Sequence, residues 1–376
     1  MSAARWLLPP ALAVWGLQSG VPVRSTERVG TTDDSTLHSV YGLVRELPSG
    51  SVLVNDVVKR QIVLFDSSLA HAAIVVSNTA EGKVRYGSMS SVLIPSAGDT
   101  TLYVDVEAKV FGVLDRRGTQ VRTVAAPKAS DVILMTSVLN GHPAVDRSGR
   151  IMYLGAGRDS TLPTGQRWLP DSAPLVRSRL GSLGVDTIAT LRIPVDQYLR
   201  QPDSKTVRAR IDPQTDDWAV LPDGTIAIVR GHDYHVDWIA PDGSVRATPK
   251  MPIVWRRLTD SEKQTVADSM SRAWTALQRP GYRAEVLPSD LPEYFPAFRR
   301  GSVYAGPDGS LWILPLASAE RRAGLVFDVV NRDGAVYQRV SLPVGCDLAG
   351  FGRAGALYLR CIAADAVRLE RARVAR

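Results

Sequence analysis

The two cysteines, Cys346 and Cys361, are the only thiols in the chain, and their spacing predicts a contact across a hairpin. The point midway between them falls at Arg353-Ala354-Gly355, which has the composition of a tight turn. In an oxidising compartment such a pair forms a disulfide, which would stiffen the last part of the fold. The alternative is two buried thiols in the core. The pair is not a C-x-x-C redox motif.

Polar side chains that end β-rich runs are the candidates for a metal site. Asn55, Asp56 and Asp105 offer amide and carboxylate oxygens, the ligands that Ca²⁺ prefers. The equivalent position of a later run is Arg230, whose positive charge would oppose a cation. Because four oxygen ligands do not recur in register, the sequence favours turn or strand-end roles for these residues.

His232 and His235 are the one close pair among five histidines. On a strand end, residues separated by three positions do not share a face as they would on a helix. The pair therefore indicates a polar loop between two strands rather than a metal site. The chain also lacks the H-E-x-x-H motif and a phosphate-binding loop.

A recurring turn phrase shows which elements must position these residues. A turn that contains glycine, followed by a β-rich run, occurs six times, with the glycines at Gly50, Gly98, Gly149, Gly224, Gly309 and Gly355. Some units contain a second glycine turn further along, at Gly118, Gly243 and Gly334. Each unit is therefore predicted to be a four-stranded antiparallel meander.

Six such meanders predict an all-β fold, a six-bladed β-propeller over residues 36–376. Two unrelated β-sandwich domains are the alternative, but they give no reason for matched turns. An insertion in blade five begins with the capping box of Thr259 and Glu262 and predicts a helix. We expect that helix to pack on the propeller rim. A second insertion, residues 155–172 in blade three, is predicted to be a loop.

The N-terminal residues have the pattern of a targeting segment rather than of a folded domain. After Arg5, a run of twelve mostly apolar residues has the shape of a secretory signal and is too short to span a bilayer. We expect residues 1–20 to be a signal peptide and residues 21–35 a flexible leader. The expected location is outside the cytoplasm, periplasmic or extracellular. The alternative is an apolar segment that packs on the body of the protein.

Composition excludes several classes of protein. Hydrophobic residues make up 45% and charged residues 22% of the chain, as in a folded protein. The formal net charge of +7 comes from 45 basic and 38 acidic residues spread along the chain. Basic blocks with interleaved aromatic residues are absent, so we expect no nucleic-acid partner.

The turn phrases Pro222-Asp223-Gly224 and Pro307-Asp308-Gly309, each followed by a β-rich run, resemble blades of bacterial six-bladed propellers of the NHL-repeat and TolB-like superfamily. The resemblance covers residues 36–374 and implies architecture rather than chemistry. Its members include binding scaffolds, sensors and metal-dependent lactonases.

We therefore expect a monomeric propeller that binds a protein or a small molecule on one face without a cofactor. The alternative is a calcium-dependent lactone or ester hydrolase of the gluconolactonase type that uses the central channel. That alternative requires Asn55, Asp56 and Asp105 to surround one cavity with further oxygen ligands.

Overall fold

The computed structural model describes residues 20–33, 36–78, 86–87, 91–96, 99–157, 160–161, 167–168, 170–200, 205–276, 280–319, 324–363 and 366–375. The predicted signal segment, residues 1–20, lies outside these ranges except for Gly20. None of the helices in the described ranges is long and apolar enough to cross a membrane.

The glycine turns form the hairpins that the sequence predicts. Gly50, Gly224 and Gly309 have φ values of 83°, 88° and 83°, in the left-handed region that glycine adopts without strain. Four separate antiparallel sheets of four strands follow from these turns. Their strands are β2 (Arg45–Glu46), β3 (Val52–Asp56), β4 (Gln61–Phe65), β5 (Ala72–Ser77); β6 (Leu93–Pro95), β7 (Thr101–Asp105), β8 (Val110–Leu114), β9 (Gln120–Ala125); β10 (Ala144–Val145), β11 (Arg150–Leu154), β14 (Ser172–Arg179), β15 (Asp186–Arg192); and β18 (Asp217–Val220), β19 (Ile226–Arg230), β20 (His235–Ile239), β21 (Val245–Ala247).

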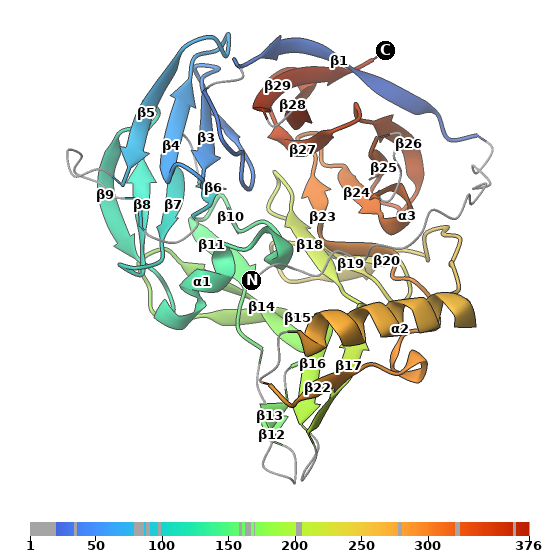
Figure 1. Ribbon diagram of the computed structural model, residues 1–376. Coiled ribbons are helices and arrows are strands. Elements are labelled where there is room, and N and C mark those ends of the chain that lie inside the picture. Colours follow the sequence, from blue (N-terminus) through green and yellow to red (C-terminus); the bar gives the residue numbers. More distant parts are fainter. Residues whose placement is uncertain are drawn as a thin grey trace.

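The remaining large sheet has eight strands and contains both chain ends of the described fold. One half is the meander β23 (Phe298–Ala305), β24 (Leu311–Pro315), β25 (Val326–Val330) and β26 (Val336–Ser341). The other half is β27 (Cys346–Phe351), β28 (Ala356–Ala363) and β29 (Ala366–Val374), with β1 (Val23–Thr31) between the halves. Figure 1 shows the sheets arranged in a ring, which is a propeller-like, all-β architecture.

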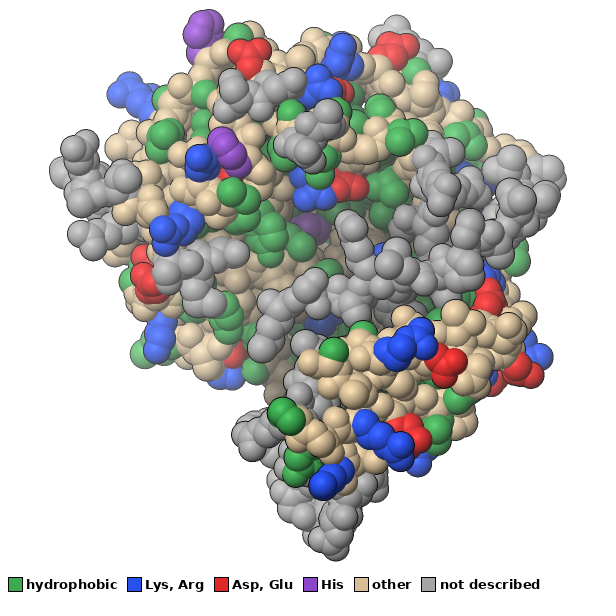
Figure 2. All heavy atoms as spheres, in the orientation of Figure 1, with side chains coloured by type: hydrophobic (Ala, Val, Ile, Leu, Met, Phe, Trp, Pro, Cys, Tyr) green, Lys and Arg blue, Asp and Glu red, His purple; other side chains and the backbone are tan. Residues whose placement is uncertain are grey.

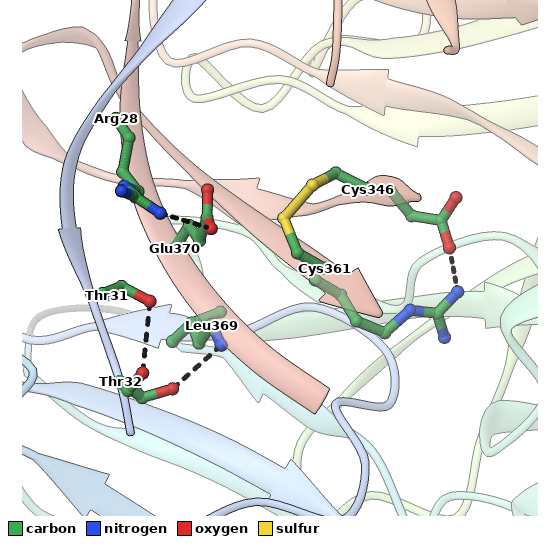
Figure 3. Close-up of a disulfide and its surroundings, with 9 residues drawn as sticks. Arg28, Thr31, Thr32, Cys346, Cys361, Leu369 and Glu370 are labelled. Carbon is green, nitrogen blue, oxygen red and sulfur yellow. Dashed lines mark hydrogen bonds and ion pairs between the residues drawn. A yellow bond between two sulfur atoms is a disulfide. The ribbon is translucent and has the colours of Figure 1, made fainter. Parts of the chain in front are cut away.

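Strand β1 corrects one expectation from the sequence. Residues 21–35 were expected to be a flexible leader, but Val23–Thr31 pairs antiparallel with β29 and, at its start, parallel with β26. The Arg28 guanidinium lies 3.3 Å from the Glu370 carboxylate, and the Leu369 N–H donates to the Thr32 hydroxyl oxygen at 3.1 Å (Figure 3). The strand is ordered because β29 would otherwise expose unpaired backbone groups along its edge.

Side chains from neighbouring sheets pack against one another and form the core. Between the fourth sheet and the β23–β26 meander, Val229, Val236, Val303 and Ile313 are fully buried in one cluster. The last and first sheets are joined by polar contacts as well. The Tyr358 hydroxyl donates to Glu46 at 2.9 Å, and Arg371 donates to the Tyr358 hydroxyl. Burial between sheets therefore couples segments that are far apart in sequence.

The predicted helix is α2 (Asp260–Thr275), and its capping box is formed by Thr259 and Glu262. We expected it to pack on the rim of the ring, but it does not. Figure 1 shows the helix beside a small sheet of β16 (Val195–Arg200), β17 (Thr206–Asp212) and β22 (Arg283–Glu285), and its buried side chains cluster with residues of β17 and β22. Trp274 is buried there with Ile211 and Ala284. The strands come from two links that are distant in sequence, so local periodicity gave no sign of them.

The short elements complete the chain. The insertion expected as a loop over residues 155–172 contains a two-stranded hairpin, although part of it lies outside the described residues. Its strands are β12 (Ser160–Thr161) and β13 (Arg167–Trp168). The remaining short helices are α1 (Val132–Met135), α3 (Leu316–Ala319), η1 (Ala129–Asp131), η2 (Val138–Asn140), η3 (Pro288–Asp290) and η4 (Arg353–Gly355).

Candidate functional site

Asn55 and Asp56, the first candidates for metal binding, are buried and hydrogen-bonded to their own surroundings. The Asn55 amide donates to the Ser91 carbonyl at 2.6 Å and accepts from the Tyr86 hydroxyl at 2.7 Å. The Asp56 carboxylate accepts the Ser39 hydroxyl and the His38 N–H. These contacts stabilise a link and a turn rather than presenting oxygens to a shared cavity.

The other predicted metal-site residues also lie in separate places. Asp105 accepts the Ala108 N–H within the turn after β7. Arg230 donates to Asp216 and Asp237, both at 2.8 Å. His235 Nε2 lies 3.2 Å from the Asp237 carboxylate, and His232 is exposed. The structure therefore brings Arg230 and His235 together in one ion cluster, but not with Asn55, Asp56 or Asp105.

Cys346 and Cys361 form a disulfide in the structure (Figure 3). They are direct partners in the register of β27 and β28, as expected from the turn midway between them. Within the described part of the chain, Cys346, Cys361 and Glu370 are the one grouping of three side chains close enough to share an ion. The thiols are already bonded to each other and Glu370 pairs with Arg28, so this grouping does not fit a cation.

A cavity of about 210 Å³ lies between the links that precede the first and third sheets and both halves of the eight-stranded sheet. Figure 2 shows the corresponding face hollowed near its centre, with apolar and charged side chains beside the hollow. Its lining comes from the links before β2 and β10 and from strands β23, β24, β25, β27 and β28. We call this the central cavity. Its polar lining side chains are Tyr41, His142, Tyr304, Asp347 and Arg360.

His142 and Tyr304 form an aromatic pair in this lining. Their ring centroids are 4.8 Å apart, and Tyr304 also contacts Phe327 edge-on at 5.8 Å. The His142 Nε2 atom is buried without a hydrogen-bond partner among the described residues. Burial lowers the pKa of His142 to about 4 and raises the pKa of Tyr304. Both side chains are therefore uncharged at neutral pH, and the imidazole keeps unused hydrogen-bonding capacity.

A buried carboxylate fixes the segments that carry this pair. Asp217, at the start of β18, accepts the Ser302 and Val303 N–H groups of β23 at 2.8 and 3.1 Å. Burial raises the pKa of Asp217 to about 7, although the N–H groups that it accepts act in the opposite direction. Asp217 thus connects two neighbouring sheets at a bulge in β23, just before Tyr304.

The neighbouring residue, Trp218, holds the link that leads to His142. Its indole N–H donates to the Asn140 carbonyl at 3.0 Å. The Arg300 guanidinium donates to the Asn140 side chain. Gly141, at φ 79°, turns the chain between Asn140 and His142, and a Cβ there would lie 2.3 Å from the indole nitrogen of Trp218. The link and β23 are therefore positioned by one polar network.

Asp347 and Arg360 form an ion pair that lines the cavity beside the disulfide. They are direct cross-strand partners on β27 and β28, one register step from Cys346 and Cys361. The two side chains are partly exposed, Asp347 at 45% and Arg360 at 37%. The disulfide therefore fixes the register of the strands that present this pair.

The sequence prediction missed most of this site. It selected polar residues by their position at strand ends and the two histidines by their proximity to each other. His142, which stands alone in a link, and Asp347, which stands beside a cysteine, met neither criterion. The available signal was position: His142 lies two residues before β10 and Asp347 is the second residue of β27, and the first strand of a meander faces the centre of a propeller.

Comparisons with known proteins support the fold. The chain matches no family model and no curated protein at the level of sequence. A solved structure of a member of the DUF4221 family from Bacteroides vulgatus has a TM-score of 0.53 at 10% identity, over 93% of this chain and 98% of that one. At such identity the likeness shows the fold alone, an all-β propeller-like one.

Two further similar structures have lower TM-scores. A calcium-binding protein, regucalcin, from Agrobacterium tumefaciens has a TM-score of 0.46 at 11% identity, over 93% of this chain and 94% of that one. A gluconolactonase from Xanthomonas campestris has a TM-score of 0.43 at 12% identity, over 90% and 88%. These similarities are too low to transfer a site to this chain.

Proposed function

We propose that this protein is a ligand-binding β-propeller whose central cavity takes a small molecule. The observation that carries the proposal is the cavity itself, which combines an apolar wall with His142, whose buried Nε2 has no partner in the described structure. Binding sites in proteins are typically concave and apolar with a few polar groups that orient the ligand. A buried polar atom without a partner is costly unless a ligand or water satisfies it.

The proposal includes the blade count and the type of propeller. The eight-stranded sheet divides into two four-stranded blades where β1 meets β26, because that contact is a short parallel pairing between outer strands. Counted in this way, the fold has six blades, as in the NHL-repeat and TolB-like superfamily. In the last blade, the N-terminal strand β1 completes the meander of β27, β28 and β29.

Export from the cytoplasm is part of the same proposal. The disulfide between Cys346 and Cys361 supports it, since disulfides persist in oxidising compartments. A short apolar run after Arg5 agrees with a secretory signal.

A calcium-dependent hydrolase is not proposed. Asn55, Asp56 and Asp105 bond to separate links and turns. The central cavity offers a single carboxylate, Asp347, among its described lining residues, and Arg360 pairs with it. A hard cation needs six or more oxygen ligands, so the described residues do not fit this metal.

The test is a fragment screen by ligand-observed NMR on two variants beside the wild type. Leu325→Trp places an indole in the cavity wall, whereas Val344→Trp adds the same side chain at a site that is 71% exposed in the link between β26 and β27. We expect small molecules that bind the wild type and Val344→Trp but not Leu325→Trp. If no fragment distinguishes the two variants while both remain folded, the central cavity is not a binding site.

A further inference from the structure

The charges around the central cavity are balanced. Among the described residues of its lining, Asp347 and Arg360 are the charged side chains, one of each sign. His142 and Tyr304 are neutral because burial lowers the pKa of the imidazole and raises the pKa of the phenol. A ligand with a net charge would therefore leave one charge of this partly exposed pair without a partner.

The two charged groups keep free hydrogen-bonding capacity in spite of their contact. Arg360 donates to Asp347 through one terminal nitrogen, while its Nε is buried with no partner in the described structure. The second oxygen of Asp347 accepts no hydrogen bond from a described residue. A guanidinium has five N–H donors, and the two oxygens of a carboxylate can accept several hydrogen bonds. The pair can therefore bind an anionic group at Arg360 and a cationic group at Asp347, next to each other.

The rest of the wall is apolar. Leu314, Leu325, Phe327 and Leu348 line the cavity together with Val40 and Val138. Apolar side chains of a ligand would be favoured there by about 25 cal/mol for each Å² removed from water. The polar and apolar parts of the lining are thus distinct.

The volume restricts the ligand further. At about 210 Å³, the cavity lies below the range of roughly 300–1,000 Å³ that is usual for drug-sized ligands. The ligand must then be small.

We propose that the central cavity binds a free amino acid with an apolar side chain in its zwitterionic form. This inference rests on the proposed ligand-binding function and names its ligand class. The α-carboxylate pairs with Arg360 and the α-ammonium pairs with Asp347. The apolar side chain lies against Leu325 and Phe327. A peptide end carries only one of the two charges at its terminal residue, so a free amino acid fits better.

Titration calorimetry with three matched compounds tests this. The compounds are L-leucine, which carries both charges, 3-methylbutylamine, which lacks the carboxylate, and 4-methylpentanoate, which lacks the ammonium. We expect L-leucine to bind the wild type at least tenfold more tightly than either analogue. Valine, methionine and phenylalanine, measured in the same way, define the size of side chain that the cavity accepts.

Two variants make the test independent of one substitution. Asp347→Asn leaves Arg360 as the charged group and is expected to move the preference to 4-methylpentanoate. Arg360→Gln leaves Asp347 and is expected to move it to 3-methylbutylamine. The control is Asp333→Asn, which breaks the exposed pair with Arg246 and is expected to keep the wild-type preference. Thermal melts establish that each variant is folded.

The outcomes separate this inference from the proposed function. Fragments that Leu325→Trp excludes, together with no binding by any of the apolar amino acids, would overturn the zwitterion inference and leave the binding cavity in place. The same conclusion follows if Asp347→Asn and Arg360→Gln keep the wild-type order of the three compounds. If no small molecule of any kind distinguishes Leu325→Trp from Val344→Trp, both proposals are wrong.

Discussion

Two buried groups beside the central cavity are expected to give opposite pH dependences of stability. Asp217 has its pKa raised by burial from 3.8 to about 7. The folded protein therefore binds this proton more tightly than the unfolded chain does. The stabilisation is complete below about pH 4 and is lost as the pH rises through 7. At about 1.36 kcal/mol for each pKa unit, the loss is about 4 kcal/mol.

His142 acts in the reverse direction. Burial lowers its pKa from 6.5 to about 4, so the unfolded chain binds the proton more tightly. The neutral imidazole is stable in the fold above pH 6.5, and stability is lost as the pH falls towards 4. The magnitude is about 3 kcal/mol by the same conversion. Between pH 4 and 6.5 the two contributions nearly cancel in the wild-type protein.

Replacing either group removes its contribution to the pH dependence of stability, and the difference from the wild type measures that contribution. In Asp217→Asn, the free energy of unfolding should rise with pH, relative to the wild type, by about 4 kcal/mol between pH 4 and 7.5. In His142→Gln it should fall relative to the wild type by about 3 kcal/mol between pH 4 and 6.5. Groups common to all the variants cancel in these differences.

The assay is urea unfolding followed by tryptophan fluorescence at four pH values, with linear extrapolation to water. The double variant Asp217→Asn/His142→Gln is the control, because it should lack both contributions. If the curves of unfolding free energy against pH are parallel for the wild type and Asp217→Asn, the carboxylate is not buried as the structure has it. Parallel curves for His142→Gln would refute the reasoning for the imidazole in the same way.

Two further predictions concern closure of the ring. Replacing Cys346 and Cys361 by serine should lower the unfolding free energy by about 3 kcal/mol, since the linked residues are 15 apart; reducing agent should destabilise the wild type by a similar amount and the variant not at all. Deleting residues 1–31 removes β1 and exposes the edge of β29. The truncated protein should melt at a lower temperature and self-associate with concentration in sedimentation velocity; an unchanged melt would contradict the role of β1.

Local features of the sequence predicted much of the fold. The turn at Gly224 is encoded by Asp223 and Gly224 themselves, because their conformational preferences act within four residues. Helix α2 begins where Thr259 and Glu262 form a capping box, which is again a contact over three positions. The cysteine spacing likewise placed the pair on either side of a single turn.

The outer strand of the last blade depended on contacts that no local pattern contains. Val23–Thr31 pairs with β29, more than 300 residues away. Most of its own side chains are exposed, so its sequence has no pattern of buried residues. Its order comes from the unpaired edge that it covers. The packing surface of α2 was missed for the same reason, since β17 and β22 come from separate links.

The sequence by itself determined the turns, the meanders and the capped helix, because each depends on residues close together in the chain. Only the tertiary structure decided which side chains share the central cavity. His142 meets Tyr304, and Asp217 meets Val303, across different sheets. Their pKa values depend on burial that exists only once the ring is assembled. A long-range meeting of this kind leaves no periodic trace in the sequence, which is why Asn55, Asp56 and Asp105 were selected and the cavity residues were not.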